Sequence, residues 1–397
     1  MCAFFLPDDV KWILEKLYNA GYRADIVGGP VRDMLRGVKP SDFDITTSAR
    51  PEETKFVFSG ERIIETGIKH GTVTLLKNGE QYEITTYRID GEYEDSRHPK
   101  SVIFTASIEE DLARRDFTVN AIAYSERFGI TDPFGGRGDI EKKIIRAVGI
   151  AEDRFTEDAL RIIRGIRFAS TLGFKIEEKT KSAMLKTAHL LENISKERIF
   201  VEWKKLLSGP LALEIIEEFL CVIYHFFPEV KIPENINTGA FLSSSLLAKH
   251  ISLFALSGAD VYQSAMHRLR TDRVTADSGK SVIEKIGKYD KNDVGFAFML
   301  RDLGFENSRI LLECEAILGI SDSSAKDSLE RLESSGIPYK ISMLDIGGGD
   351  LMDLGFSGVE IGRTLLILQE KIFYGSLKNQ KEDLKDAAIN IKNHSRK

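Results

Sequence analysis

The pattern of hydrophobic and polar positions changes near residue 150. Before that point, segments that alternate with period two, typical of strands, are interleaved with segments of helical period. From about Glu152 onwards helical periods dominate to the end, interrupted by breaks that contain glycine or proline. The pattern therefore predicts an α+β head followed by an all-helical remainder.

The start of the head predicts a helix, a strand and a second helix. An amphipathic helix is expected near Asp8–Ala20, and an apolar strand at Ala24–Val27. Gly28 and Gly29 end the strand, and the next helix is expected over Val31–Leu35. Pro30 suits the first helical turn, where a missing backbone N–H costs nothing.

Three later segments complete the expected head. Ser41–Thr47 alternates between polar and apolar residues, which predicts a strand. Gly71–Leu76 and Tyr82–Arg88 are expected to form a hairpin around Asn78-Gly79, a strong signal for a tight turn. The polar stretch Ile89–Ile103 has no clear period and is expected to be a loop.

Length and composition are those of a globular protein. At about 100–200 residues per domain, 397 residues indicate two to four packed units. The apolar content of 42% and charged content of 29% are ordinary for a soluble chain. Neither a long apolar run nor a signal-peptide pattern occurs, so a cytoplasmic location without membrane contact is expected.

Three scattered cysteines, Cys2, Cys221 and Cys314, argue against a disulfide framework and a zinc site. A metal would therefore need oxygen ligands, which favours Mg²⁺, with Mn²⁺ as an alternative. The net charge of −6 does not suggest a nucleic-acid binder, but polyanion binding depends on local patches. Two basic stretches, 154–167 and 267–291, could form such patches or ordinary solvated faces.

Asp42 and Asp44 are the candidate catalytic residues. On a strand, residues i and i+2 point to the same face, so both carboxylates would project together. Two such carboxylates repel unless a cation lies between them, and two metal ions can clamp the reacting oxygens of a phosphoryl transfer. Asp-x-Asp alone is a weak signal, because many strands end that way at a turn.

Candidate phosphate contacts surround this motif. Gly28 and Gly29 would expose backbone N–H groups at a helix start, with Arg32 close by, although a simple tight turn explains them equally well. Arg114 and Arg115 offer forked donors for a triphosphate. Two acids remain: Glu83 is either a third metal-proximal carboxylate or a surface acid, and Asp116 is expected to bind the arginines rather than metal.

Asp158, Arg161, Arg164 and Arg167 form the last constellation. On one helix, Asp158 and Arg161 would be i, i+3 neighbours, and the other two arginines would continue that row. The simplest interpretation is an intrahelical salt bridge with solvated arginines. The alternative is that Asp158 and Arg161 present an acceptor and donors that match the Watson–Crick edge of a base, so that the protein acts as template.

Together and in this order, these segments resemble the motifs of bacterial CCA-adding enzymes, which are class II tRNA nucleotidyltransferases. The matching motifs lie close together over residues 20–210, and the match is less clear after residue 210. The matching stretches are Val27–Asp33, Asp42–Asp44, Arg114-Arg115, Asp132–Asp139, Glu157–Arg167 and Glu197–Leu206.

The resemblance implies a polymerase-β-like nucleotidyltransferase head at residues 1–150, a neck at 151–210, a body at 211–325 and a tRNA-binding tail at 326–397. It implies that Asp42 and Asp44 hold the catalytic Mg²⁺ ions, with tRNA, CTP and ATP as partners. It further implies triphosphate contacts from Gly29, Arg32 and Arg115, with Arg164 and Arg167 nearby. Asp158 and Arg161 would pair with the incoming base, and Asp139 would lie in a hinge.

Relatives with the same head remain as alternatives. Poly(A) polymerases differ in the segment that follows the first motif, and CC-adding relatives lack a loop that is complete here over Arg88–Pro99. Enzymes that add only A are harder to separate. An RNA-binding protein with a silent head is the non-enzymatic alternative, which the intact pair Asp42 and Asp44 argues against.

Overall fold

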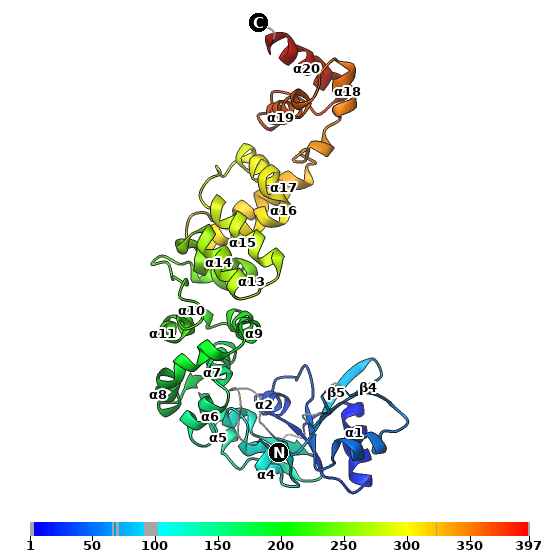
Figure 1. The fold of residues 1–397 in the computed structure, drawn as a ribbon, viewed down its shortest axis with the longest axis vertical. Coiled ribbons are helices and arrows are strands. Elements are labelled where there is room, and N and C mark those ends of the chain that lie inside the picture. The colour runs from blue at the N-terminus through cyan, green and yellow to red at the C-terminus, as the bar shows by residue number, and fades with distance from the viewer. Residues whose placement is uncertain (1–3, 66, 69–70, 91–101, 323, 396–397) are drawn as a thin grey trace. The chain divides into compact units, whose positions relative to one another are not determined.

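The computed structural model describes residues 4–65, 67–68, 71–90, 102–322 and 324–395. The chain forms two compact units that meet in sequence between Pro228 and Glu229 (Figure 1). The first unit contains a mixed sheet and helices, and the second contains helices only among its described residues. The finer division into neck, body and tail stays a prediction.

A seven-stranded sheet forms the centre of the head. Its order is β3-β4-β5-β2-β1-β8-β9, and all neighbouring strands are antiparallel except the parallel pair β2 and β5. The strands are β1 (Ala24–Val27), β2 (Ile45–Thr47), β3 (Arg62–Ile64), β4 (Thr72–Lys77), β5 (Glu80–Thr86), β8 (Ala123–Ser125) and β9 (Gly129–Thr131). Every residue of β1 is buried, including the charged residue Asp25.

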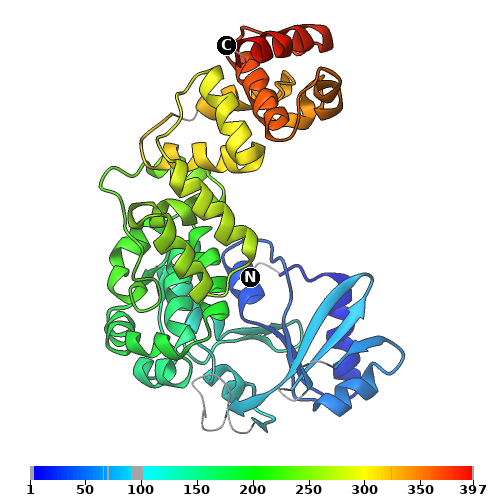
Figure 2. The same ribbon diagram turned by 45° about the horizontal axis from the view of Figure 1, so that its top comes forward.

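The expected helices and hairpin of the head are confirmed. α1 (Asp8–Asn19) and α2 (Gly29–Leu35) match the two expected helices, and α3 (Pro51–Val57) and α4 (Ile108–Ala113) also belong to the head. The β4–β5 turn holds Asn78 and Gly79 at φ 51° and 86°, the left-handed conformation that a two-residue hairpin requires. α1 lies beside this hairpin (Figure 2). Lys77 Nζ is 3.8 Å from the centre of the Trp12 ring.

Two predictions about the head were wrong in part. The strand expected over Ser41–Thr47 begins only at Ile45. Its partner β1 ends at Val27, whose N–H makes the last ladder bond to the Asp44 carbonyl, so residues 41–43 have no strand to pair with. The expected loop Ile89–Ile103 starts and ends in a two-stranded sheet of β6 (Arg88–Asp90) and β7 (Val102–Phe104), and its residues 91–101 lie outside the described part.

Helices make up most of the rest of the first unit. They are α5 (Gly136–Lys142), α6 (Ala151–Glu157), α7 (Leu160–Leu172), α8 (Glu178–Thr187), α9 (Lys196–Leu207), α10 (Ala212–Glu218) and α11 (Leu220–Ile223), with a short parallel pair β10 (Ile144–Ile145) and β11 (Lys175–Ile176). α7 packs against α9, which carries the buried side chain of Trp203. A Cβ at Gly165 would lie 2.8 Å from the Phe117 ring, so only glycine allows α7 to approach the head this closely.

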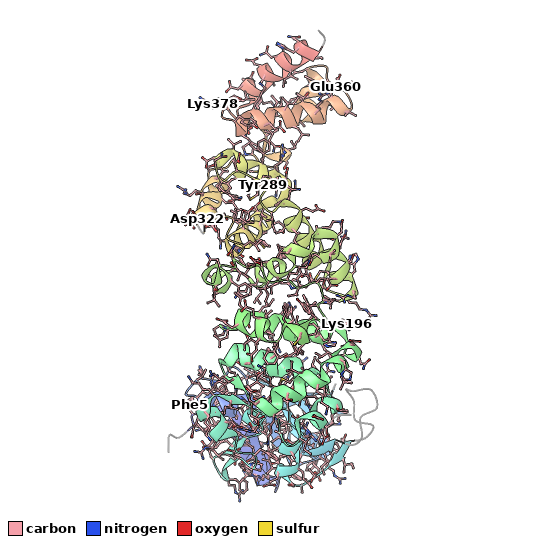
Figure 3. All side chains as sticks on the ribbon, turned by 90° about the vertical axis from the view of Figure 1, so that its left-hand side faces the viewer. Phe5, Lys196, Tyr289, Asp322, Glu360 and Lys378 are labelled. Atoms are coloured by element: carbon pink, nitrogen blue, oxygen red, sulfur yellow. The ribbon has the colours of Figure 1, made fainter. Side chains whose placement is uncertain are left out.

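The second unit is helical throughout its described residues (Figure 3). Its helices are α12 (Thr238–Ser243), α13 (Leu246–Phe254), α14 (Ala259–Arg268), α15 (Arg273–Lys285), α16 (Asp293–Ile317), α17 (Ser324–Ser334), α18 (Gly348–Asp353), α19 (Val359–Phe373) and α20 (Lys381–Ser395). Gly304 breaks α16 with φ 73° and ψ 169°. The last three helices share a small apolar core that includes Leu351, Leu368 and Leu384.

Candidate active site

Asp42 and Asp44 lie in the irregular segment that leads into β2, and both are exposed. The parallel register places Ile84 of β5 opposite Ile45, so Glu83 lies near Asp44 at the same end of the sheet. The surrounding protein displaces water from the Asp44 carboxylate and raises its pKa; Arg115 opposes this shift, while Asp42 and Glu83 add to it. Three carboxylates and one guanidinium therefore interact at this edge.

The turn between β1 and α2 faces Arg115. Gly28 adopts φ 79° and donates its N–H to the Ile122 carbonyl at 3.0 Å. A Cβ at this position would lie 3.0 Å from Arg115 Nη1, so glycine allows the guanidinium to approach the backbone. The expected break at Gly28 and Gly29 thus brings the end of β1 next to an arginine.

Arg115 retains hydrogen-bonding capacity. Its Nη2 lies 3.6 Å from the buried Asp111 carboxylate, whereas its Nε is buried without a hydrogen-bond partner in the described part of the chain. Burial lowers the pKa of Arg115 despite the nearby acids, because charge is costly to remove from water. A buried guanidinium with an unused donor is suited to an anion that enters from solution.

Arg32 is held inside the protein. Its guanidinium makes two 3.0 Å hydrogen bonds to Asp33 and donates to the Asn120 side chain at 2.7 Å. It also lies over the Phe168 ring, 5.4 Å from the ring centre. The expected position beside Gly29 is therefore correct, but these donors are bonded to protein groups in this structure.

Asp158 is not part of a helix, which corrects the expected i, i+3 pair. α6 ends at Glu157 and α7 begins at Leu160, with Asp158 in extended backbone at φ −143° and ψ 101°. Its Oδ1 accepts the N–H of Leu160, the first residue of α7, at 3.0 Å, and its backbone carbonyl accepts the Arg161 N–H at 3.0 Å. Asp158 Oδ2 instead accepts from Arg198 at 3.0 Å.

Arg161 joins the head to α6. It forms a 2.7 Å ion pair with Glu157 and donates to the carbonyls of Arg154 and Arg114 at 3.1 and 2.9 Å. These contacts hold the guanidinium of Arg161 next to the backbone of Arg114 in the head.

Arg164 and Arg167 are bound to two buried acids. Arg164 pairs with Asp116 at 2.7 Å, and Arg167 pairs with Glu202 at 2.9 Å. Burial alone would raise the pKa of Asp116, but Arg164 and the Asn120 amide lower it to about 2. Asp116 was expected to bind Arg114 and Arg115, but its ion-pair partner in the structure is Arg164.

Side chains from the head and from the helices that follow it line one cavity of about 270 Å³. Its lining side chains are Arg114, Arg115, Asp116, Asp158, Leu160, Arg161, Arg164 and Arg198. Arg32 and Arg167 do not line it, and Asp42 and Asp44 are connected to it electrostatically through Arg115. Four expected site residues therefore share one cavity: Arg115, Asp158, Arg161 and Arg164.

Residues that the sequence analysis gave no role complete the site. Asp111 and Asn120 hold the head arginines, Glu202 binds Arg167, and Arg198 binds Asp158. Arg198 and Glu202 belong to the Glu197–Leu206 stretch that carried part of the resemblance, which was the only signal for them. Their contacts span 35 to 40 residues of sequence, so helical spacing could not reveal them.

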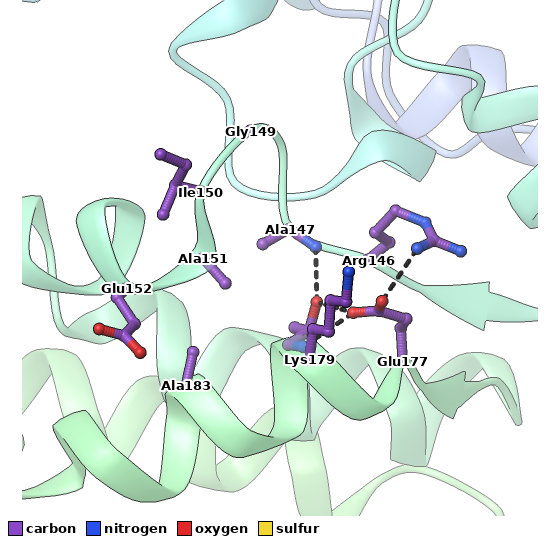
Figure 4. Close-up of a pocket in the computed structure, with 10 residues that line it drawn as sticks. Arg146, Ala147, Gly149, Ile150, Ala151, Glu152, Glu177, Lys179 and Ala183 are labelled. Carbon is purple, nitrogen blue, oxygen red and sulfur yellow. Dashed lines mark hydrogen bonds and ion pairs between the residues drawn. The ribbon is translucent and has the colours of Figure 1, made fainter.

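Arg146 ties the expected hinge to the neck. Its guanidinium binds Asp139 and Glu177, each at 3.0 Å, beside a second cavity of about 440 Å³ (Figure 4). Asp139 also accepts a 2.7 Å hydrogen bond from Thr118. The role of Asp139 as part of a hinge stays a prediction.

Two segments of this chain match models of known protein families. Residues 24–146 match a family model described as the poly A polymerase head domain, and residues 173–231 match one described as the probable RNA and SrmB-binding site of polymerase A. The CCA-adding enzyme of Streptococcus thermophilus is 39% identical over 406 residues, which cover 96% of each chain. The chain belongs to the CCA-adding enzyme family.

Further members of this family support the assignment. The CCA-adding enzyme of Streptococcus gordonii is 38% identical and covers 93% of this chain and 94% of its own. The crystal structure of the Bacillus stearothermophilus CCA-adding enzyme in complex with CTP has a TM-score of 0.83 at 30% identity, covering 98% of this chain and 99% of that one. The predicted fold class and enzyme class are confirmed. In the described part of the chain, no helix is both long and apolar enough to span a bilayer.

Proposed function

We propose that this chain adds CCA to the 3′ end of tRNA, using CTP and ATP and releasing pyrophosphate. The observation that carries the proposal is that Arg115, which interacts electrostatically with Asp44, lines the same cavity as Asp158 and Arg161. In the reaction, the tRNA 3′ oxygen forms a bond to the α-phosphorus, the bond to the β-phosphate oxygen breaks, and the hydroxyl proton leaves to solvent.

Asp42 and Asp44 are the residues that would hold Mg²⁺, with Mn²⁺ as the alternative. No group of three or more His, Cys, Asp or Glu side chains forms a metal-binding cluster among the described residues. Two carboxylates nevertheless fit Mg²⁺, which commonly takes one or two from the protein and the rest from water and phosphate. Removal from water is the main cause of the raised pKa of Asp44, and repulsion from Asp42 and Glu83 adds to it; a bound cation would offset both. When bound, the ions would acidify the attacking hydroxyl and neutralise the departing pyrophosphate.

The arginines around the cavity would bind the triphosphate. Arg115 would use its unpaired Nε, supported by the Gly29 backbone and Arg32, while Arg164 and Arg167 would add positive charge nearby. Asp158 and Arg161 would read the base. Each Asp158 oxygen has one bond in this structure and keeps a lone pair for the amino group of cytosine or adenine.

The central test is Asp44→Asn, assayed with a tRNA that lacks its 3′ CCA. We expect incorporation of CMP and AMP to fall by roughly 10³-fold or more, because the loss of metal binding removes several kcal/mol of charge stabilisation. Glu80→Gln, an exposed acid on β5, is the matched control and should retain activity. Asp44→Asn with normal incorporation would refute the metal assignment.

Sequencing the end of the product decides between the related activities. A CCA end supports the proposal, whereas a CC end, a single A or an unlimited A tract identifies one of the alternatives. The loop Arg88–Pro99, which favours full CCA addition, lies largely outside the described residues. A wild-type chain that binds tRNA but incorporates no nucleotide would indicate a silent head.

A further inference from the structure

The ring of Phe168 in α7 lies against three guanidinium groups. Their central carbon atoms are 3.6 Å (Arg167), 5.4 Å (Arg32) and 5.5 Å (Arg164) from the ring centre. Arg32 belongs to α2 of the head, whereas the other two arginines belong to α7 itself. A cation within about 6 Å of the centre of an aromatic ring is attracted to its face. Phe168 therefore gathers arginines from two parts of the first unit around one neutral side chain.

The core of the head fixes the orientation of this ring. Phe168 is 4% exposed, and the buried Phe117 meets it edge-on, with the ring centres 5.9 Å apart and the ring planes at 81°. Edge-to-face contact is a preferred geometry of aromatic pairs. Phe117 also lies against Gly165, about one turn before Phe168, so one side chain of the head holds both the helix and the ring. The faces of Phe168 are thus in place before a ligand arrives.

The ring stabilises the guanidinium groups without neutralising them. A carboxylate cancels positive charge and occupies N–H donors, whereas an aromatic ring attracts the flat face of a guanidinium and leaves the N–H groups at its rim. Arg167 donates from Nε to Glu202 at 2.9 Å, and its two terminal nitrogens make no hydrogen bond to any described residue. Phe168 therefore supports the charge of Arg167 and leaves it available to an anion.

The arginines need such support because they destabilise one another. Removal from water lowers the pKa of Arg167; Glu202 opposes this shift, and the neighbouring Arg164 adds to it. Arg32 brings a third positive charge to the same ring. Cation–π attraction is stronger in desolvated surroundings than at the protein surface. The ring can therefore offset part of the repulsion within the arginine group.

The three arginines lie at and beside the cavity of about 270 Å³. Arg164 lines this cavity, whereas Arg32, Arg167 and Phe168 are not among its lining residues. Charges that are shielded from water act over longer distances than charges at the surface, so arginines next to the lining can also stabilise a bound polyphosphate. Any effect of Phe168 on such a ligand must pass through the arginines that it contacts.

We propose that Phe168 is a positioning residue for the triphosphate of the incoming nucleotide. Its ring orients Arg32, Arg164 and Arg167 and maintains their combined positive charge, which stabilises the triphosphate in the cavity and then the departing pyrophosphate. Phe168 itself does not contact the nucleotide. This inference rests on the proposed function, because it needs a nucleoside triphosphate as substrate.

The test replaces Phe168 in the full chain with phenylalanine that carries one, two or three ring fluorines, introduced by nonsense suppression. Fluorine withdraws electron density from the ring face and weakens its attraction for cations, while the shape of the ring hardly changes. We expect the inhibition constant for pyrophosphate and the KM for CTP to rise with each fluorine, by about tenfold for the trifluorinated ring. Phe168→Leu removes the aromatic face and should raise both constants at least as far.

The matched control carries the same fluorinated residues at Phe155. This ring of α6 is also buried, but no cation lies over it among the described residues. Its series should leave both constants unchanged. A merely structural Phe168 would give the same flat series, because the packing is preserved, and this result would overturn the proposal even if Phe168→Leu unfolds. An equal rise at both positions would overturn it too, since the effect would not depend on the arginine contacts.

The two hypotheses fail in different ways. If the wild-type chain incorporates no CMP, the proposed function is wrong and the role of Phe168 is wrong with it. If the wild-type chain adds CCA but the fluorinated Phe168 series keeps wild-type constants, only the further inference fails.

Discussion

The arginines of the cavity of about 270 Å³ and the basic segment 267–291 look alike in sequence but differ in structure. In the second unit, cations of the segment are paired with carboxylates on neighbouring turns or helices. The pairs are Arg268–Glu229 at 2.7 Å, Arg273–Asp277 at 3.0 Å, Lys280–Asp260 at 3.1 Å, Lys285–Asp302 at 3.2 Å and Lys291–Glu315 at 2.6 Å. The Arg273 side chain is 92% exposed. This segment therefore resembles a solvated, neutralised face.

Around the cavity of about 270 Å³, some arginine nitrogens lack hydrogen-bond partners among the described residues. Asp111, Asp116 and Glu202 are buried and hold several arginines, yet Arg115 Nε and Arg198 Nη1 are buried donors without partners among the described residues. The difference shows that a high density of basic residues does not by itself identify an anion site. Burial combined with unused donors is the more informative sign.

Among the changes that test this comparison, Arg115→Ala should have the largest effect. Loss of a preorganised donor to developing charge costs about 3 kcal/mol, so kcat/KM for CMP incorporation should fall by roughly 10²-fold or more. Arg273→Ala, which removes the same charge from the second unit, should leave this value nearly unchanged. Equal losses in the two variants would show that overall charge, and not the cavity, governs nucleotide use.

An intermediate effect is expected from Asp116 at low pH. Its folded pKa of about 2 lies below its ordinary value of 3.8, so its contribution to stability is complete above pH 4 and is lost as the pH falls towards 2. The free energy of unfolding of the wild-type chain should fall on the order of 2 kcal/mol further than that of Asp116→Asn over this range. Parallel pH profiles in urea unfolding would contradict the strong pairing with Arg164.

The smallest effect is expected from Lys280→Ala in the basic segment. Its exposed ion pair with Asp260 should contribute less than about 1 kcal/mol to stability. The dissociation constant for tRNA and its dependence on salt should stay close to wild-type values. A clearly shallower salt dependence would show that Lys280 contacts a phosphate and that the two regions resemble each other after all.

Local patterns in the sequence predicted most of the elements that the head uses. The apolar run of β1, the Asn78-Gly79 turn and the amphipathic α1 were all predictable, because each depends on neighbouring residues. The start of β2 at Ile45 was not, because it depends on where β1 ends. Segment 91–101, which was expected to be part of a loop, lies outside the described residues.

The site was predictable in its chemistry but not in its contacts. The sequence indicated an acidic pair and an arginine cluster, and it indicated that Asp116 would bind arginine. It did not indicate that Asp158 would lie outside the helix. That position depends on the Asp158 carboxylate, which accepts the Leu160 N–H in competition with helical hydrogen bonds. The contact between Asp158 and Arg198 joins two helices, and no periodicity encodes it.

The pairing of β1 with β8 also has a consequence for protein synthesis. The N–H of Gly28 bonds to the carbonyl of Ile122, so the turn beside Arg115 is closed by a segment made almost one hundred residues later. A nascent chain that still holds β8 inside the ribosome cannot complete this turn. The head therefore cannot complete this turn until β8 has left the ribosome, by which time the local β4–β5 hairpin has had time to form.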